Sequence, residues 1–286
     1  MCATCGCGGD HVHDHDHGPT PGHGGESPAH HHPHEEVMGI DGTRIVRMEQ
    51  DILARNDAHA AENRRHFAER AILALNLVSS PGSGKTTLLE NTLRWLHGRC
   101  PVAVIEGDQQ TALDAERIRV TGTPAVQINT GRVCHLDAHG VGHALADLPA
   151  LDRGILFIEN VGNLVCPALF DLGEATTVLI LSVTEGEDKP RKYPAMFHRA
   201  NLILINKIDL LPYLRFDLDA CLTHIRQTNP GADIIQIAAS TGQGMDRWHD
   251  WLERRRHDLL QARLARLEGD AAALREDLDR SGRARV

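Results

Sequence analysis

A glycine-rich turn early in the chain constrains the fold more than any other feature. The apolar run 72–78 leads directly into SSPGSGKTT at 79–87, and the helix-like segment LLENTLRWL follows at 88–96. A strand that enters a glycine-rich turn at the N-terminus of a helix is the arrangement that binds phosphate groups. The usual motif opens with glycine, whereas this chain has Ser79 there. The pattern predicts a phosphate-binding loop.

The residues of this loop suit separate tasks in phosphate binding. Glycines let backbone N–H groups close around phosphate oxygens. Lys85 supplies positive charge to the β- and γ-phosphates, and the Thr86 hydroxyl is a ligand for Mg²⁺. The predicted nucleotide-binding residues of the loop are Gly82, Ser83, Gly84, Lys85, Thr86 and Thr87.

Apolar runs alternate with loops and helical stretches along most of the chain. They lie at 72–78, 102–105, 125–128, 155–158, 178–183, 202–205 and 234–237. Strands that alternate with helices imply a mainly parallel sheet covered on both faces. The sequence therefore predicts an α/β, three-layer P-loop NTPase fold, with further helices from about Asp41 to Arg70 and from Met245 to about Arg280.

Leucines repeat at three- and four-residue multiples along the predicted C-terminal helix. They are Leu260, Leu264, Leu267, Leu274 and Leu278. The stripe either packs on the domain or forms a short coiled coil with a partner; we favour packing because Gly269 weakens a continuous seam. The predicted division is a tail at 1–36, a GTPase domain with its N-terminal helix at 37–267 and a helical extension at 268–286.

The motif NKID at 206–209 follows the apolar run 202–205 and predicts guanine recognition. The Asp209 carboxylate can accept from both the ring N–H and the exocyclic amine of guanine, a donor pair that adenine lacks. Asn206 and Lys207 complete the motif. The segment AASTG at 238–242 loosely resembles a second base-side loop, where only the backbone of Ala239 is a plausible donor. GTP and GDP are the expected nucleotides.

Two acidic residues follow strands at the expected loop edge of the sheet, where this architecture places its ligands. Asp108 lies in EGDQQT, and Glu159 ends the run GILFIE two residues before Val161-Gly162. Thr86, Asp108 and Glu159 are the candidate magnesium ligands, although a solvated loop acid is the alternative for Asp108. With Lys85 and Gly162 they form the predicted catalytic set. We expect slow turnover because no glutamine is placed to orient water.

The first 36 residues predict a flexible, metal-binding tail, because they are nearly empty of large apolar side chains. Cys2, Cys5 and Cys7 offer three thiolates, which with one nitrogen suit a four-coordinate, square-planar nickel site. Nine of the 19 histidines lie between His11 and His34, a pattern typical of nickel storage or buffering.

Three further candidate metal ligands lie inside the domain. Cys134 and His135 are in the loop after the run 125–128, and Cys166 lies seven residues past Glu159. These loops follow strands that border the nucleotide site, so a metal ion there could respond to the γ-phosphate. From the residues alone, buried or idle cysteines are an equal alternative.

The chain closely resembles the HypB family, the nickel-insertion GTPases of nickel–iron hydrogenase maturation in the SIMIBI class. The shared motifs are CATCGC, SSPGSGKTT, VIEGDQQT, INTGRVCHLDA, FIENVGNLVCP, EGEDKPRKYP and NKIDLLPY. The resemblance implies a high-affinity nickel site at Cys2, Cys5 and Cys7. It also implies a nickel or zinc site formed by Cys134, His135 and Cys166 at a GTP-linked dimer interface.

The same resemblance implies partners: a second copy of the chain, a HypA-type nickel metallochaperone and, through it, the hydrogenase large subunit. A formal net charge of -9 argues against a nucleic-acid-binding or membrane-coating protein. No signal peptide or membrane span is evident, so we expect a cytoplasmic protein. The rival interpretations are a urease accessory GTPase and a nickel store without enzymatic activity.

Overall fold

A computed structural model describes residues 42–108, 113–131 and 133–283. The predicted tail at 1–36, with Cys2, Cys5 and Cys7, therefore lies outside the described residues. The chain divides into two compact units, residues 1–52 and 53–286. All strands, the phosphate loop and the segment that bears Cys134, His135 and Cys166 belong to the second unit.

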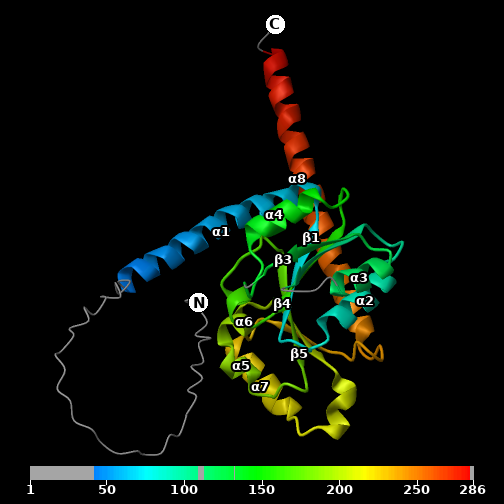
Figure 1. Ribbon diagram of the computed structural model, residues 1–286. Helices are drawn as coiled ribbons and strands as arrows, with labels where there is room; N and C mark the ends of the chain where they lie inside the picture. Colours follow the sequence, from blue (N-terminus) through cyan, green and yellow to red (C-terminus); the bar gives the residue numbers. More distant parts are fainter. Residues whose placement is uncertain (1–41, 109–112, 132, 284–286) are drawn as a thin grey trace, which may run out of the picture. The chain divides into compact units, whose positions relative to one another are not determined.

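Seven parallel strands form one sheet in the order β3-β2-β4-β1-β5-β6-β7 (Figure 1). Their bounds are β1 Leu73–Ser79, β2 Val102–Asp108, β3 Ala125–Asn129, β4 Ile155–Gly162, β5 Thr176–Ser182, β6 Leu202–Asn206 and β7 Asp233–Gln236. Each of the seven apolar runs forms a strand. The predicted α/β fold with a parallel sheet is confirmed.

Helices connect these strands. The α-helices are α1 Gly42–Arg70, α2 Lys85–Leu96, α3 Leu113–Val120, α4 Ala138–Ala146, α5 Lys189–Lys192, α6 Pro194–Arg199, α7 Leu218–Thr228 and α8 Met245–Arg283. Two short 3-10 helices, η1 Cys166–Ala168 and η2 Ile208–Tyr213, follow β4 and β6.

Alternate strand residues face opposite layers, because side chains alternate along a strand. On one face, Leu75 and Phe157 pack with residues of α2, α3 and α8. On the other face, Ile158 packs with α1 and α4, and Ile205 packs with α6 and α7. Both faces of the sheet are thus covered, which explains why the central strands are mainly apolar.

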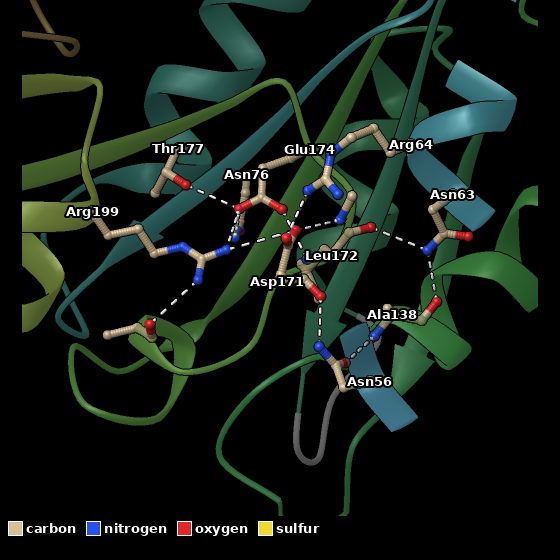
Figure 2. Close-up of polar contacts among 12 residues, drawn as sticks. Asn56, Asn63, Arg64, Asn76, Ala138, Asp171, Leu172, Glu174, Thr177 and Arg199 are labelled. Carbon is tan, nitrogen blue, oxygen red and sulfur yellow. Dashed lines mark hydrogen bonds and ion pairs between the residues drawn. The ribbon is translucent and has the colours of Figure 1, made fainter. Parts of the chain in front are cut away.

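Polar side chains join the C-terminal half of α1 to the start of α4 and to the loop at Asp171, as Figure 2 shows. Asn56 accepts from the Ala138 amide at 2.9 Å, and Asn63 donates to the Ala138 carbonyl at 2.8 Å. Asn56 also donates to the Asp171 carbonyl at 2.8 Å. Both asparagines are buried, so these bonds fix α1 against the first turn of α4.

The predicted packing of the C-terminal leucines is wrong for four of the five. Trp248 and Leu252 are buried against the sheet, but the leucines farther along α8 are 47–69% exposed. These are Leu264, Leu267, Leu274 and Leu278. The cause is length: 39 helical residues span about 58 Å, whereas a seven-residue strand spans only about 23 Å. The helix also continues through Gly269.

None of the helices that the structure describes is both long enough and apolar enough to cross a membrane.

Candidate functional site

The phosphate loop has the backbone conformation that the sequence predicts. Gly82 and Gly84 have φ angles of 75° and 91°, which L side chains rarely adopt. A Cβ on Gly84 would also lie 2.6 Å from the Asn206 amide nitrogen. Both glycines line a cleft of about 690 Å³ at the start of α2. The loop is therefore shaped to direct backbone N–H groups into this cleft.

The base-side motif is bonded to the back of the phosphate loop. Asn206 donates to the Ser83 carbonyl at 2.8 Å and accepts from the Ala239 amide at 3.0 Å. Lys207, in a left-handed conformation, donates to the Gly82 carbonyl at 2.7 Å. Asn206 and Lys207 thus hold the loop, and the Ala239 amide is engaged by Asn206 in this structure. Base contact by Ala239 stays a prediction.

Asp209 lies in the first turn of η2, two residues after Lys207. Its Oδ1 is buried and has no hydrogen-bond partner among the described residues. A buried carboxylate oxygen without a donor costs free energy, which a ligand with N–H groups can recover. This matches the guanine edge that the sequence motif predicts.

Lys85, Thr86 and Glu159 converge at the floor of the cleft. Glu159 Oε1 accepts from Lys85 Nζ at 3.1 Å and from Thr86 Oγ1 at 2.8 Å. Its other oxygen, Oε2, is buried without a hydrogen-bond partner in the part of the chain that is described. The carboxylate therefore occupies the position where a phosphate would compete for Lys85 and where a cation would compete for the Thr86 hydroxyl.

A second buried acid, Glu106, lies beside Glu159 in the register of β2 and β4. Burial raises the pKa of Glu106 to about 8, with smaller contributions from the negative charges of Glu159 and Asp108. Glu106 Oε2 is likewise buried and unpartnered among the residues described here. Asp108 and Gly162 line the cleft above these acids. Crowded carboxylate oxygens with little compensating charge suit a divalent cation such as Mg²⁺.

Glu106→Gln is expected to stabilise the protein free of nucleotide and metal at neutral pH. The pKa of Glu106 is about 8 in the folded chain against an ordinary 4.5, so the free energy of unfolding falls as pH rises between these values. Glutamine stays neutral and removes this loss. We expect a gain on the order of 3 kcal/mol at pH 7 and under about 1 kcal/mol at pH 5.

Urea unfolding at both pH values measures this difference, with the exposed Glu116→Gln as control. An equal effect of Glu106→Gln at pH 5 and pH 7 would show that ionisation of Glu106 is not the cause.

Two residues beneath the phosphate loop were not predicted from the sequence. Glu185 accepts from Ser83 Oγ at 2.5 Å and from the Ser182 amide at 3.0 Å. Lys189 donates to Ser80 Oγ at 3.3 Å and pairs with Glu185 at 3.5 Å. Both lie in the EGEDKPRKYP motif, but nothing in that motif indicates which distant loop it supports. They connect the end of β5 to the phosphate loop.

Cys134, His135 and Cys166 form a compact cluster. One potential ligand atom from each lies within 4.8 Å of the others, and the two sulfurs are 2.6 Å apart. Loops after β3 and β4 bring them together, although 32 residues separate the cysteines. Two thiolates and one imidazole are ligands of borderline metals such as Ni²⁺ and Zn²⁺. The alternative of idle cysteines does not account for this convergence.

His135 is prepared for binding as a neutral imidazole. Its ring stacks on Phe170 with centroids 3.7 Å apart, and its Nδ1 is buried without a hydrogen-bond partner among the described residues. Burial lowers the pKa of His135, and nearby Asp137 opposes this only in part. A neutral ring with a free nitrogen is the form that ligates metal.

The end of β4 contacts both the nucleotide cleft and the cysteine cluster. Glu159 bonds to Lys85 and Thr86, while the next residue, Asn160, accepts from the Leu136 amide at 3.2 Å. Asn163 then donates to the Cys134 carbonyl at 3.2 Å. Sequence reasoning missed both asparagines because their partners lie in another loop. The cleft and the cluster also share Cys134, which lines the cleft.

Known proteins resemble this chain over most of its length. The nucleotide-binding domain family described as CobW/HypB/UreG matches residues 73–236. Hydrogenase maturation factor HypB of Azotobacter vinelandii is 59% identical over 252 residues, covering 88% of this chain and 82% of the relative. The Escherichia coli K12 protein of the same name is 58% identical over 230 residues, covering 79% of each. The chain belongs to the HypB family of hydrogenase maturation factors.

Solved HypB structures share the architecture described above. HypB from Archaeoglobus fulgidus is 39% identical with a TM-score of 0.67, covering 71% of this chain and 99% of that one. HypB from Helicobacter pylori, solved in complex with nickel, is 38% identical with a TM-score of 0.68 and covers 71% and 96%. The predicted membership of the HypB family is confirmed.

Proposed function

We propose that this HypB-family chain is a GTP-hydrolysing nickel metallochaperone that inserts nickel into the large subunit of nickel–iron hydrogenase during its maturation. Its cargo is Ni²⁺, with Zn²⁺ as a second metal for the cysteine cluster. The His-rich tail stores nickel, and Cys2, Cys5 and Cys7 hold it tightly. The chain acts in the cytoplasm as a GTP- and metal-dependent homodimer, together with a HypA-type metallochaperone.

One observation carries this proposal: Cys134 belongs to the cysteine cluster and also lines the nucleotide cleft. A change in the cleft is therefore transmitted directly to a metal ligand. Nickel as the metal is supported by the Helicobacter pylori relative, whose structure was solved in complex with nickel.

The bonds of β4 suggest how nucleotide and metal affinity are linked. Lys85 and Thr86 now bond to Glu159 and must turn toward the phosphates when GTP binds. Thr86, Asp108 and Glu159 would hold Mg²⁺, which neutralises phosphate charge when it is bound. A shift of Glu159 moves the adjoining Asn160 and Asn163, which hold the loop that bears Cys134 and His135. The GTP-bound and GDP-bound chains thus bind metal at the cysteine cluster with different affinities.

Replacing Asp209 by asparagine is expected to weaken GDP binding by at least about 100-fold. The side-chain amide of the asparagine presents an N–H donor to the exocyclic amine of guanine, which is also a donor. Xanthine has a carbonyl oxygen in place of that amine and can accept from the asparagine. XDP should therefore bind the variant more tightly than GDP. Calorimetric titration with both nucleotides measures this reversal, with exposed Asp219→Asn as control. Unchanged GDP affinity would exclude base recognition by Asp209.

The cellular function is tested in cells that lack the chain, by the nickel content and activity of the hydrogenase large subunit. Loss of nickel from hydrogenase, restored by excess nickel in the medium, is the expected result. The nickel content of urease is measured in parallel. Urease that lacks nickel, together with hydrogenase of normal nickel content, would identify the chain as a urease accessory GTPase. If the purified chain did not hydrolyse GTP, the rival interpretation, a nickel store without enzymatic activity, would be supported instead.

A further inference from the structure

A group of histidines lies outside the cysteine cluster, between the described part of α1 and helix α4. His139 and His143 are one turn apart on α4, and their Nε2 atoms are 3.0 Å from each other. The His59 ring, from α1, lies 4.9 Å from the His139 ring between centroids. The three line a cleft of about 790 Å³. The proposed function uses none of them.

The distance between the two Nε2 atoms fits a shared metal ion. Two imidazole nitrogens that each lie 2.0–2.1 Å from one ion, at angles of 90–109°, are about 2.8–3.4 Å apart. Histidines four residues apart on a helix are a recurrent way to supply two such ligands. The pair in α4 therefore already has the spacing of a metal-bound pair.

The packing of α1 on α4 keeps His59 close to this pair. Asn56 and Asn63 lie one turn to either side of His59, and both bond to Ala138 at the start of α4 (Figure 2). Gly142 allows this close approach, since a Cβ there would lie 3.0 Å from Asn63 Oδ1. The histidines thus come from two helices whose contact is fixed by buried bonds.

Glu62 suits the task of orienting His59. Its Oε2 lies 3.5 Å from His59 Nδ1, so a small rotation of the ring would let the carboxylate accept a hydrogen bond from Nδ1–H and leave Nε2 for a metal ion. Histidine ligands usually donate their second N–H to such a partner. His59 is not within 4.8 Å of both α4 nitrogens, so its ring must rotate to complete the set. The ring is 42% exposed, which leaves room for this rotation.

We propose that His59, His139 and His143 form a second, solvent-exposed site for a divalent transition-metal ion such as Zn²⁺ or Ni²⁺, with Glu62 orienting His59. The site is separate from the cysteine cluster, although α4 begins three residues after His135. A three-imidazole site offers nitrogen ligands only, and imidazole suits Zn²⁺ and Ni²⁺. This inference does not depend on the proposed GTPase cycle.

The test is a Zn²⁺ titration of the full-length chain followed by imidazole ¹H–¹⁵N spectra, with ring signals assigned by single His→Gln variants. The signals of His59, His139 and His143 should titrate together with one dissociation constant. In His143→Gln, that constant should rise at least tenfold for the two remaining rings. The matched control is His97→Gln/His257→Gln, which replaces two exposed histidines elsewhere and should leave the curve unchanged.

Three outcomes would overturn the proposal. Ring signals of the α4 pair that do not respond to Zn²⁺ would mean that the 3.0 Å contact is only a hydrogen bond. A His59 signal that stays unchanged would remove it from the ligand set. The Cys134→Ser/Cys166→Ser variant separates the two sites: the three rings should still titrate there, and loss of their response would assign them to the cysteine cluster.

Discussion

Replacing Lys85 by alanine is expected to lower kcat for GTP hydrolysis by at least about 100-fold, a loss of roughly 3 kcal/mol of transition-state stabilisation. Lys85 is the first residue of α2 and lies on the floor of the cleft, where its side chain is only 12% exposed. A point charge in such a site is worth more than in water, because the surrounding dielectric is low. No other lysine described here contacts Glu159.

Phosphate release under saturating GTP measures this effect. Lys192→Ala is the matched control: this exposed lysine pairs with Asp188 at 2.6 Å, so its loss removes the same charge without touching the cleft. Lys85 also compensates Glu159, so circular dichroism must show that the variant is folded at the assay temperature. A folded Lys85→Ala chain with wild-type kcat would refute the catalytic assignment.

Replacing Cys134 or Cys166 by serine is expected to weaken metal binding at the cluster by at least about 100-fold, because two of its three candidate ligands are thiols that bind metal as thiolates. A serine hydroxyl is a poor ligand for Ni²⁺ and Zn²⁺. Nucleotide affinity should stay within about threefold of the wild type, since the phosphate loop and the 206–209 motif are untouched and serine is close in size to the Cys134 that lines the cleft. The GTP dependence of metal release should disappear.

Competition with a chromophoric chelator, in GDP and in a non-hydrolysable GTP analogue, measures both properties. Cys100→Ser is the matched control, because Cys100 is a half-buried free cysteine outside the cluster. If both cysteine variants kept a GTP-dependent change in metal release, the proposed linkage through Cys134 would be contradicted. The tail is expected to bind metal independently of the cluster. The decisive quantity is therefore the difference in metal release between the GDP-bound chain and the chain bound to the GTP analogue.

The phosphate loop and the strand pattern were predictable because their signals are local. A glycine conformation is encoded by the residue itself, and a fully buried parallel strand is encoded by a continuous apolar run. Each of the seven runs is a strand, and the loop 79–87 enters α2 as expected. The C-terminal leucines show the limit, since the same stripe fits a packed or an exposed helix until the length of the sheet is known.

Side-chain partners across the sheet could not be predicted in this way. Glu185 under Ser83, and Asn160 bonded to the Leu136 amide, depend on which loops the strand order brings together. The raised pKa of Glu106 depends on its burial beside Glu159. Such contacts join positions 24–102 residues apart, and many other pairings are compatible with the same sequence pattern.

By itself, the sequence determined the fold class, the phosphate loop, the 206–209 motif and the residue types available to bind metal, since each depends on neighbours along the chain. Only the tertiary structure decided that Cys134, His135 and Cys166 converge beside the nucleotide cleft, and that His59 faces the histidines of α4. The physical reason is that parallel strands bring the loops at their carboxyl ends to one edge, and buried asparagines fix α1 on α4.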